Sequence, residues 1–290
     1  MPAGDTTTSS LADSLPTQID SARQVREFKG VMPQIVEKHT LPEGTGLSWD
    51  EVDIASLTSQ AVTENTTLDN PQQMTDTIRT VTPSVVGVHT FMTKRVQGRM
   101  SKKAFAKLGG LSQNAIQRRK DTDGIAVFAG ATQTHGASGT TMTFGHVAAA
   151  VARAEGNATE PASGPYFLVQ HPFPLKDIAD EIRASVGTYE VTSGLTAEVY
   201  HGGSPGMVAG AQVFPAGNIV FESGPDARGG IFPKMAIGIV QGFSPWNYTR
   251  PEPQKGGGGD SAWLYDEYAY FERTTLWLVG HLADATTPTS

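Results

Sequence analysis

The stretch SQNAIQRRKDTDGIAVFAGA, residues 112–131, places three adjacent bases before an Asp-x-Asp-Gly sequence and a small apolar run. It predicts the C-terminal part of a basic helix that begins at Ser101, a residue type preferred as an N-cap. We expect Asp-x-Asp-Gly to end this helix, and Gly109-Gly110 to kink or weaken it. Apolar residues recur with a period near 3.6 at Phe105, Leu108, Leu111, Ala115 and Ile116.

The bases of this helix belong to a wider segregation of charge. Residues 41–78 carry seven carboxylates and no lysine or arginine: Glu43, Asp50, Glu51, Asp53, Glu64, Asp69 and Asp76. Residues 79–120 carry ten bases and no acid: Arg79, Lys94, Arg95, Arg99, Lys102, Lys103, Lys107, Arg118, Arg119 and Lys120. Such runs of charge could simply be two solvent-exposed faces of the protein that bind no partner. An acidic segment of one subunit lying on the basic segment of its neighbour would also explain them, as would contact between the bases and nucleic acid phosphates.

Residues 41–78 also have the pattern of an extended arm. Leu47, Trp49, Val52 and Ile54 alternate with polar residues, and threonine is abundant, which favours strands. Few residues of this segment could fill a core. An isolated hairpin is marginally stable in water, so we expect a two-stranded arm that reaches away from the body and lies on another surface.

The rest of the chain predicts strands and helices in separate runs. Residues 79–100 read as extended, and a possible helix at 21–39 is interrupted by Gly30 and Pro33. A capped helix is expected at 143–155, a buried strand in PYFLVQHP, and a helix opened by Pro174 and ended by Gly187. Strands dominate after residue 206, with RPEPQKGGGGDS (250–261) as a loop between the last two long ones. This order predicts an α+β fold.

The composition and the N-terminal residues exclude several classes of protein. The chain has 290 residues, 38% of them hydrophobic, and a net charge of −7, enough for one large domain or two smaller ones. The absence of cysteine excludes disulfides, thiolate nucleophiles and cysteine-ligated zinc. Residues 1–20 are polar and predict a flexible arm, with neither a secretory signal nor a membrane-spanning run. We expect a soluble cytoplasmic protein.

The motifs typical of enzymes and metal sites are incomplete. GGSPG (202–206) matches a nucleophile elbow, but Pro205 follows the serine and has no N–H to stabilise an oxyanion. KGGGGD (255–260) lacks the Gly-Lys-Ser/Thr ending of a phosphate loop. Asp121 and Asp123 resemble half of a calcium loop without its closing glutamate, and the seven histidines form no metal-binding spacing. We therefore predict no catalytic, cofactor-binding or metal-binding residue.

The order of these segments resembles the major capsid proteins of tailed bacteriophages with the Hong Kong 97-type fold. The arm at 41–80 is followed by a basic helix that ends in AIQRRKDTDGIAVFAG, similar to the "spine" helix of that family. TFGHVAAAVARAEGN and GPYFLVQHPFPLKDIADEIR resemble the helix, strand and helix of its axial domain, and YAYFERTTLWLVGHLAD resembles the closing strands of its peripheral domain. The resemblance covers about residues 35–285.

The resemblance implies an α+β capsid fold with five parts. They would be an N-terminal arm (1–40), an extended loop or E-loop (41–80), a peripheral domain with the spine helix (81–130), an axial domain (131–260) and closing strands of the peripheral domain (261–290). It further implies a non-enzymatic shell protein without cofactors. Copies would form hexamers and pentamers of an icosahedral shell that encloses double-stranded DNA in the virion, after assembly in the host cytoplasm. The partners would include a portal and, in some relatives, a decoration protein.

Two departures from the family refine these expectations. About 35 residues precede the arm, too few for a fused scaffolding domain, so a separate scaffolding protein is expected. The segment 41–78 has no lysine, which argues against the isopeptide cross-linking of the type member. Within this fold, an encapsulin-like cellular compartment is the alternative. Outside it, the alternatives are a nucleic-acid-binding protein built on residues 94–120 and, third, a hydrolase.

Overall fold

The structure is a computed structural model that describes residues 30–65, 71–99, 102–184, 206–222 and 224–289, with the backbone alone at 102–108 and 183–184. Within these residues the helices are α1 Met32–Ile35, α2 Lys94–Arg99, α3 Lys102–Ala126, α4 Phe144–Glu155 and α5 Pro172–Ala184, with short 3-10 turns at Val127–Gly130 and Lys234–Ala236. The strands are β1 Glu37–Thr40, β2 Trp49–Ile54, β3 Asp76–Val81, β4 Ser84–Thr93, β5 Gln133–Gly136, β6 Tyr166–Gln170, β7 Met207–Val208, β8 Ala211–Pro215, β9 Asp226–Pro233, β10 Ile237–Pro251, β11 Gly259–Glu272 and β12 Val279–Asp284.

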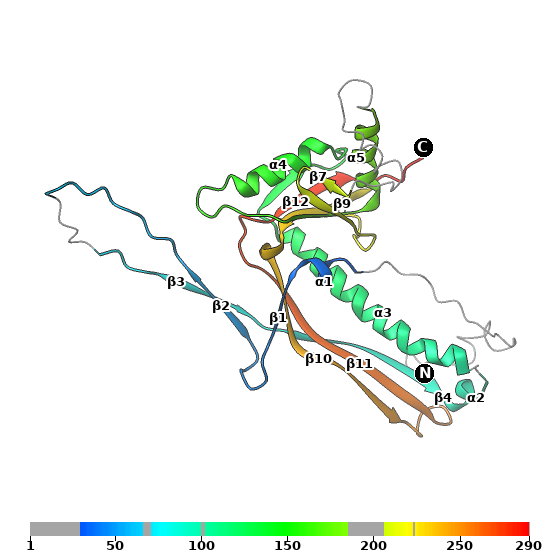
Figure 1. Ribbon diagram of the computed structural model, residues 1–290. Helices are drawn as coiled ribbons and strands as arrows, with labels where there is room; N and C mark the ends of the chain where they lie inside the picture. The colour runs from blue at the N-terminus through cyan, green and yellow to red at the C-terminus, as the bar shows by residue number, and fades with distance from the viewer. Residues whose placement is uncertain (1–29, 66–70, 100–101, 185–205, 223, 290) are drawn as a thin grey trace.

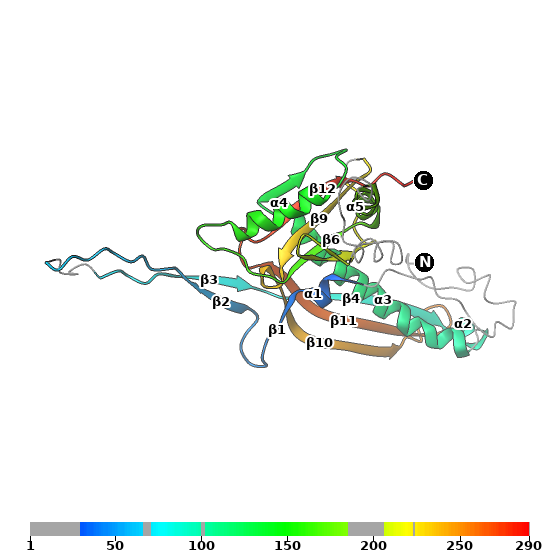
Figure 2. The same ribbon diagram turned by 45° about the horizontal axis from the view of Figure 1, so that its top comes forward.

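The strands form three sheets, and the predicted α+β class is confirmed. The long sheet has the order β1-β10-β11-β4, and α3 lies along one of its faces (Figure 1). The compact sheet has the order β5-β12-β9-β6-β8-β7 and carries α4 and α5. The third sheet is the pair β2-β3, which extends away from the rest of the molecule in both views (Figures 1 and 2).

The helix α3 passes through both sequences that were expected to disrupt it. It is continuous at Gly109-Gly110, and it continues through residues 121–124 to Ala126. The Asp121 carboxylate does not turn back onto its own helix, because it accepts hydrogen bonds from the backbone N–H groups of Val31 (2.6 Å) and Met32 (2.9 Å). It also accepts one from the Asn218 side chain at 2.7 Å. The prediction that the helix ends there was therefore wrong.

Glycine at position 124 allows this part of α3 to pack closely. A Cβ atom there would lie 2.7 Å from the Met32 side chain and 3.0 Å from the Tyr270 ring. The glycine thus lets the helix approach both α1 and β11, and it serves packing instead of ending the helix.

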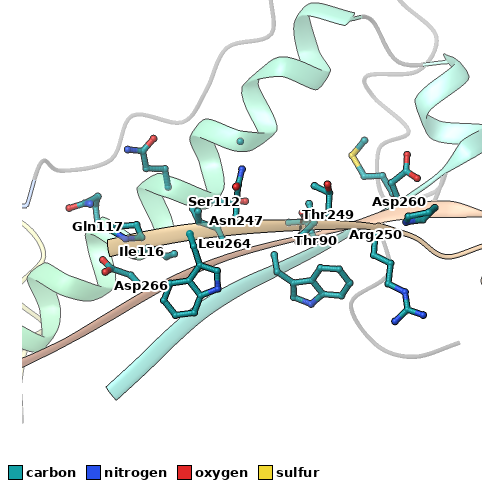
Figure 3. Close-up of a pocket in the computed structure, with 18 of the residues that line it drawn as sticks. Thr90, Ser112, Ile116, Gln117, Asn247, Thr249, Arg250, Asp260, Leu264 and Asp266 are labelled. Atoms are coloured by element: carbon teal, nitrogen blue, oxygen red, sulfur yellow. Dashed lines mark hydrogen bonds between the residues drawn. The ribbon is translucent and has the colours of Figure 1, made fainter. Parts of the chain in front are cut away.

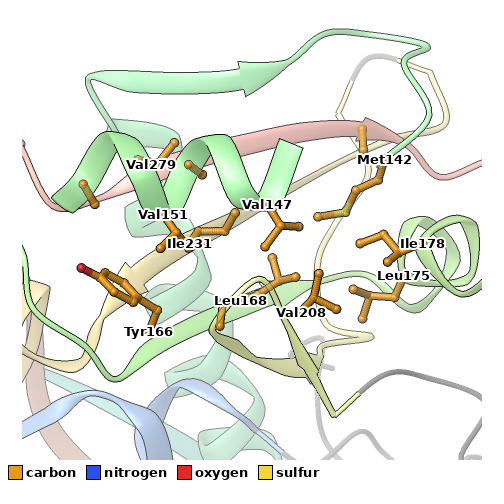
Figure 4. Packing of buried hydrophobic residues seen from close by; sticks show 14 of the residues in the cluster. Met142, Val147, Val151, Tyr166, Leu168, Leu175, Ile178, Val208, Ile231 and Val279 are labelled. Carbon is orange, nitrogen blue, oxygen red and sulfur yellow. The ribbon is translucent and has the colours of Figure 1, made fainter. Parts of the chain in front are cut away.

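The compact sheet and its two helices enclose one hydrophobic core. Thr143 caps α4 as predicted, since its side chain accepts a hydrogen bond from the His146 backbone. Val147 and Val151 then face Leu168 of the fully buried strand β6 (Figure 4). The helix α5 begins at Pro172, two residues before the predicted start, and the predicted end at Gly187 falls outside the described residues.

A second core joins the compact sheet to the long sheet. Phe128 and Phe232 are fully buried, with ring centroids 5.6 Å apart, and Ile237 and Met32 belong to the same cluster. This core follows the end of α3, so the helix is fixed at the junction of the two sheets.

Strand pairing crosses two domain boundaries that the sequence suggested. The segment 131–260 was assigned to one domain, but β10 lies in the long sheet between β1 and β11. The segment 261–290 was assigned to the peripheral domain, but β12 pairs with β5 and β9 in the compact sheet. Residues 94–99, expected to be extended, form α2. No helix within the described residues is long and apolar enough to cross a bilayer.

Candidate functional site

The arm is a twisted ribbon with two unlike faces. Its register places Glu51 opposite Arg79 on one face, and Val52 opposite Ile78 on the other. The second face is open to solvent and carries Val52, Ile54 and Ile78 between the carboxylates of Asp50 and Asp76. Ile54 and Ile78 are 67% and 65% exposed. Large apolar side chains gathered on an open surface are typical of a binding site.

The root of the arm is fixed to the long sheet by packing and by an ion-pair network. Trp49 lies against His39 and Phe271, with ring centroids 4.4 Å and 5.2 Å away. Arg273 on the sheet side pairs with Glu51 of the arm and with Glu37 of β1, each at 2.7 Å. The arm therefore leaves the body in a defined direction.

The acidic residues predicted for inter-subunit contact divide into two groups. Glu51 is engaged by Arg273, and Asp53 lies 4.0 Å from Arg79 on the arm itself. Four others are exposed along the arm and the turn before it: Glu43, Asp50, Glu64 and Asp76. Asp69 lies outside the described residues.

The predicted basic residues divide in the same way. Four have a carboxylate partner within the chain: Arg79 with Asp53, Lys94 with Asp260 at 3.0 Å, Arg119 with Asp123 at 2.8 Å, and Lys120 with Asp266 at 2.7 Å. Arg95 and Arg99 on α2 are exposed. Arg118 on α3 is also exposed, but it has an interaction within the chain. The side chains of Lys102, Lys103 and Lys107 are not described.

Lys120 does not belong to an exposed basic surface, and its assignment to one is corrected. Its side chain is buried between α3 and the long sheet, where it donates to Asp266 and to Gln241 (2.9 Å). Its ammonium group also lies 4.7 Å from the centre of the Tyr268 ring. Gln241 donates to the second Asp266 oxygen, so both oxygens of the buried carboxylate are hydrogen-bonded. No local sequence pattern indicates these contacts, because every partner of Lys120 is more than a hundred residues away in the chain.

A neighbouring polar contact explains why the end of α3 is rich in aspartate. Asp123 accepts a hydrogen bond from the Tyr268 hydroxyl at 2.9 Å, and Arg119 pairs with the same carboxylate. Burial and this acidic partner raise the pKa of Tyr268. Of the two residues that resembled half of a calcium loop, Asp123 thus holds the helix against the long sheet. Asp121 holds it to α1 and to Asn218.

A cavity of about 890 Å³ separates the middle of α3 from the long sheet (Figure 3). Ser112, Ile116 and Gln117 line it from the helix, and Asn247 and Leu264 line it from the sheet. The walls are mainly neutral polar and apolar, and its acids at the two ends, Asp260 and Asp266, already pair with lysines. The cavity lacks the paired titratable groups that would suggest a catalytic site.

The motifs weighed from the sequence do not form a site within the described residues. Residues 202–205 of GGSPG lie outside those residues, and KGGGGD spans the turn between β10 and β11. No group of three metal-ligating side chains is close enough to hold a metal ion in the part of the chain that the structure describes.

The structure is similar to solved bacteriophage capsid subunits over its whole length. The capsid protein of cyanophage P-SCSP1u is 11% identical, with a TM-score of 0.71 over 97% of this chain and 96% of that one. The mature capsid subunit of bacteriophage PhiM1 is 11% identical, with a TM-score of 0.67 over 92% and 90% of the two chains. The capsid protein of Ralstonia phage GP4 is 11% identical, with a TM-score of 0.68 over 95% of this chain and 98% of that one.

Comparison at the level of sequence finds no relative. No protein-family model matches the chain, and no curated protein sequence is similar to it. The chain nevertheless follows the fold of the capsid subunits over more than nine-tenths of its length. The chain has the Hong Kong 97-type fold that its order of elements predicted.

Proposed function

We propose that this chain is the major capsid protein of a tailed bacteriophage, and that its copies assemble into an icosahedral shell around double-stranded DNA. The observation that supports this most strongly is the full-length likeness to phage capsid subunits, which leaves almost no part of either chain unmatched. The role is structural and not enzymatic. The protein belongs to the virion and assembles in the host cytoplasm.

The shape of the isolated subunit supports assembly. The arm leaves three large apolar side chains, Val52, Ile54 and Ile78, open to solvent on one face. A two-stranded ribbon gains stability only when such a face packs on something else. The arm and the long sheet point in opposite directions from the arm root (Figures 1 and 2). An arm that contacts the next subunit therefore makes a head-to-tail interface, and such interfaces form closed rings when the rotation between neighbours closes.

The parts of the subunit then receive the following assignments. Residues 41–80 form the extended loop, and α3 is the spine helix. The long sheet, β1-β10-β11-β4, belongs to the peripheral domain. The compact sheet with α4 and α5, including β12, forms the axial domain at the symmetry axes.

The charge blocks act between subunits only where the chain has not already paired them. In the acidic segment 41–78 the exposed carboxylates are Glu43, Asp50, Glu64 and Asp76. On the receiving side the bases are Arg95 and Arg99, which also carry the alternative role of contacting packaged DNA. Exposed pairs of this kind set register and association rate more than affinity.

Further partners follow from the same role. They are a separate scaffolding protein, a portal and a decoration protein. No arm lysine exists in 41–78, so the shell is held together without isopeptide bonds to that segment.

Expression of the chain tests the proposal. We expect closed particles in negative-stain microscopy and a mass by light scattering far above the 30.8 kDa of one chain. The chain is expressed alone and with the scaffolding gene of its own locus. A stable monomer in both cases, with salt-dependent DNA binding, would instead support the nucleic-acid-binding alternative.

A further inference from the structure

The strand β4 ends the long sheet on an open edge. It pairs with β11 through ten consecutive residue pairs without a register shift, from Ser84 opposite Tyr268 to Thr93 opposite Gly259. No described residue pairs with its other edge. Ser84, Val85, Gly87 and His89 are exposed along it, so a row of backbone N–H and C=O groups faces solvent there.

Other edges of the molecule carry the features that normally prevent strand addition. The edge of β10 is covered by β1 along residues 237–241, and beyond that it contains Pro245, Pro251 and two register shifts. The outer strands β5 and β7 have four and two residues, and β2 and β3 are charged. The edge of β4 has no proline, no charge and no bulge. A long uncharged edge of this kind accepts another strand.

A matching segment lies in the distal arm. Residues 55–62, ASLTSQAV, carry no charge, are exposed, and belong to no strand of the described chain. The Gln72 side chain accepts from the Thr58 N–H at 2.9 Å and donates to its carbonyl, as a neighbouring strand would. The segment follows an extended course along the arm (Figure 1), and Gln72 of the returning half of the arm holds it at Thr58.

The arm that reaches β4 must come from another copy. Within one chain the arm extends away from the end of β4 at Thr93 (Figures 1 and 2). The charges favour a parallel alignment: Glu64 follows the arm segment, Arg95 follows β4, and both are exposed. Leu57 and Val85, which are 58% and 56% exposed, then lie at one end of the paired region.

We propose that residues 55–62 of one subunit add to the free edge of β4 of the next as a parallel fifth strand. This proposal rests on the proposed shell function and specifies how the arm binds. Because the main chain makes the contact, the side chains of 55–62 alternate between the two faces of the extended sheet. Ser59 of one copy then lies beside His89 of the other, and Glu64 lies beside Lys94 and Arg95.

The absence of native cysteine allows a direct test by disulfide formation. His89→Cys is combined in turn with Thr58→Cys, Ser59→Cys and Gln60→Cys, and assembled particles are oxidised and analysed on non-reducing gels. We expect covalent oligomers, with a yield about tenfold higher for position 59 than for 58 and 60, because successive strand residues face opposite sides. Ser59→Cys with Val220→Cys, an exposed residue of the compact sheet region, is the control and should give no oligomers.

The outcomes separate this proposal from the shell function. A period-two pattern in intact particles supports strand addition. Particles that form normally but cross-link equally at 58, 59 and 60, or not at all, overturn strand addition and leave the shell function standing. If the unsubstituted chain forms no particles, the shell function is overturned and this proposal with it.

Discussion

Lys120 and Asp266, which are 146 residues apart in the sequence, form a buried ion pair with a distance of 2.7 Å between Nζ and Oδ2. Their side chains are 8% and 1% exposed, so this pair lies inside the interface between α3 and the long sheet. Lys120, although part of the basic segment 79–120, therefore stabilises the fold of its own subunit.

Removing Lys120 should destabilise the folded subunit severely. Lys120→Ala leaves the Asp266 carboxylate buried without its charge partner, which costs about 3–5 kcal/mol. The measurement is urea unfolding of the unassembled chain. Arg119→Ala, which breaks the exposed pair with Asp123 on the same helix, should cost far less, because solvent screens an exposed ion pair. Equal losses for the two variants would show that burial does not distinguish the pairs.

Glu272 near the arm root should make stability fall as pH rises. Burial raises its pKa from 4.5 to about 6, while the charge of Arg79 opposes this shift. Between these values the folded chain binds more protons than the unfolded chain, so this contribution to stability is present below pH 4.5 and is lost as pH rises through 6. Glu272→Gln should remove this slope from the free energy of unfolding. An unchanged slope in urea titrations at pH 4.5, 5.5 and 6.5 would contradict the assignment.

His281 should produce the opposite dependence. Burial first, and then the neighbouring His146 and His135, lower its pKa from 6.5 to about 4. Between pH 6.5 and pH 4, His281 is protonated in the unfolded chain and neutral in the folded chain. The free energy of unfolding therefore decreases as pH falls from 6.5 towards 4. His281→Gln should flatten this part of the profile. A profile of His281→Gln that stays as steep between pH 6.5 and pH 4 as that of the unsubstituted chain would contradict this prediction.

The exposed apolar side chains of the arm should affect assembly and not folding. Ile54→Asn and Ile78→Asn change side chains that are already exposed, so the free energy of unfolding should change by less than about 0.5 kcal/mol. Particle yield should fall at least about tenfold, because each buried apolar side chain contributes about 1.5–3 kcal/mol at an interface. Microscopy and light scattering measure the yield.

The control for the arm variants is Val220→Asn, which alters a side chain that is 73% exposed outside the arm. Normal particle yield from both arm variants would show that this face does not contact another subunit. A loss of folding in the isolated chain would show that the face is buried within it.

Local sequence patterns were sufficient for elements whose contacts are near in the chain. Thr143 starts α4 as predicted because an N-cap acts on its own first turn. The alternation around Trp49 and Val52 predicted the two-stranded arm, because side chains of a strand face opposite sides in turn. The order of these elements was enough to predict the capsid fold, although identity to the matched capsids is 11%.

The sequence by itself determined the charge blocks, the arm and the α+β class, since each depends on residue types at short spacing. Only the tertiary structure decided which charges are available for a neighbour. Asp260, Asp266 and Arg273 come from β11 and the segment after it, and they pair with Lys94, Lys120 and Glu51 of the two blocks. The end of α3 was decided in the same way. Asp121 binds the Val31 and Met32 backbone and Asn218, because folding brings these distant groups within hydrogen-bonding distance of a carboxylate that would otherwise end the helix.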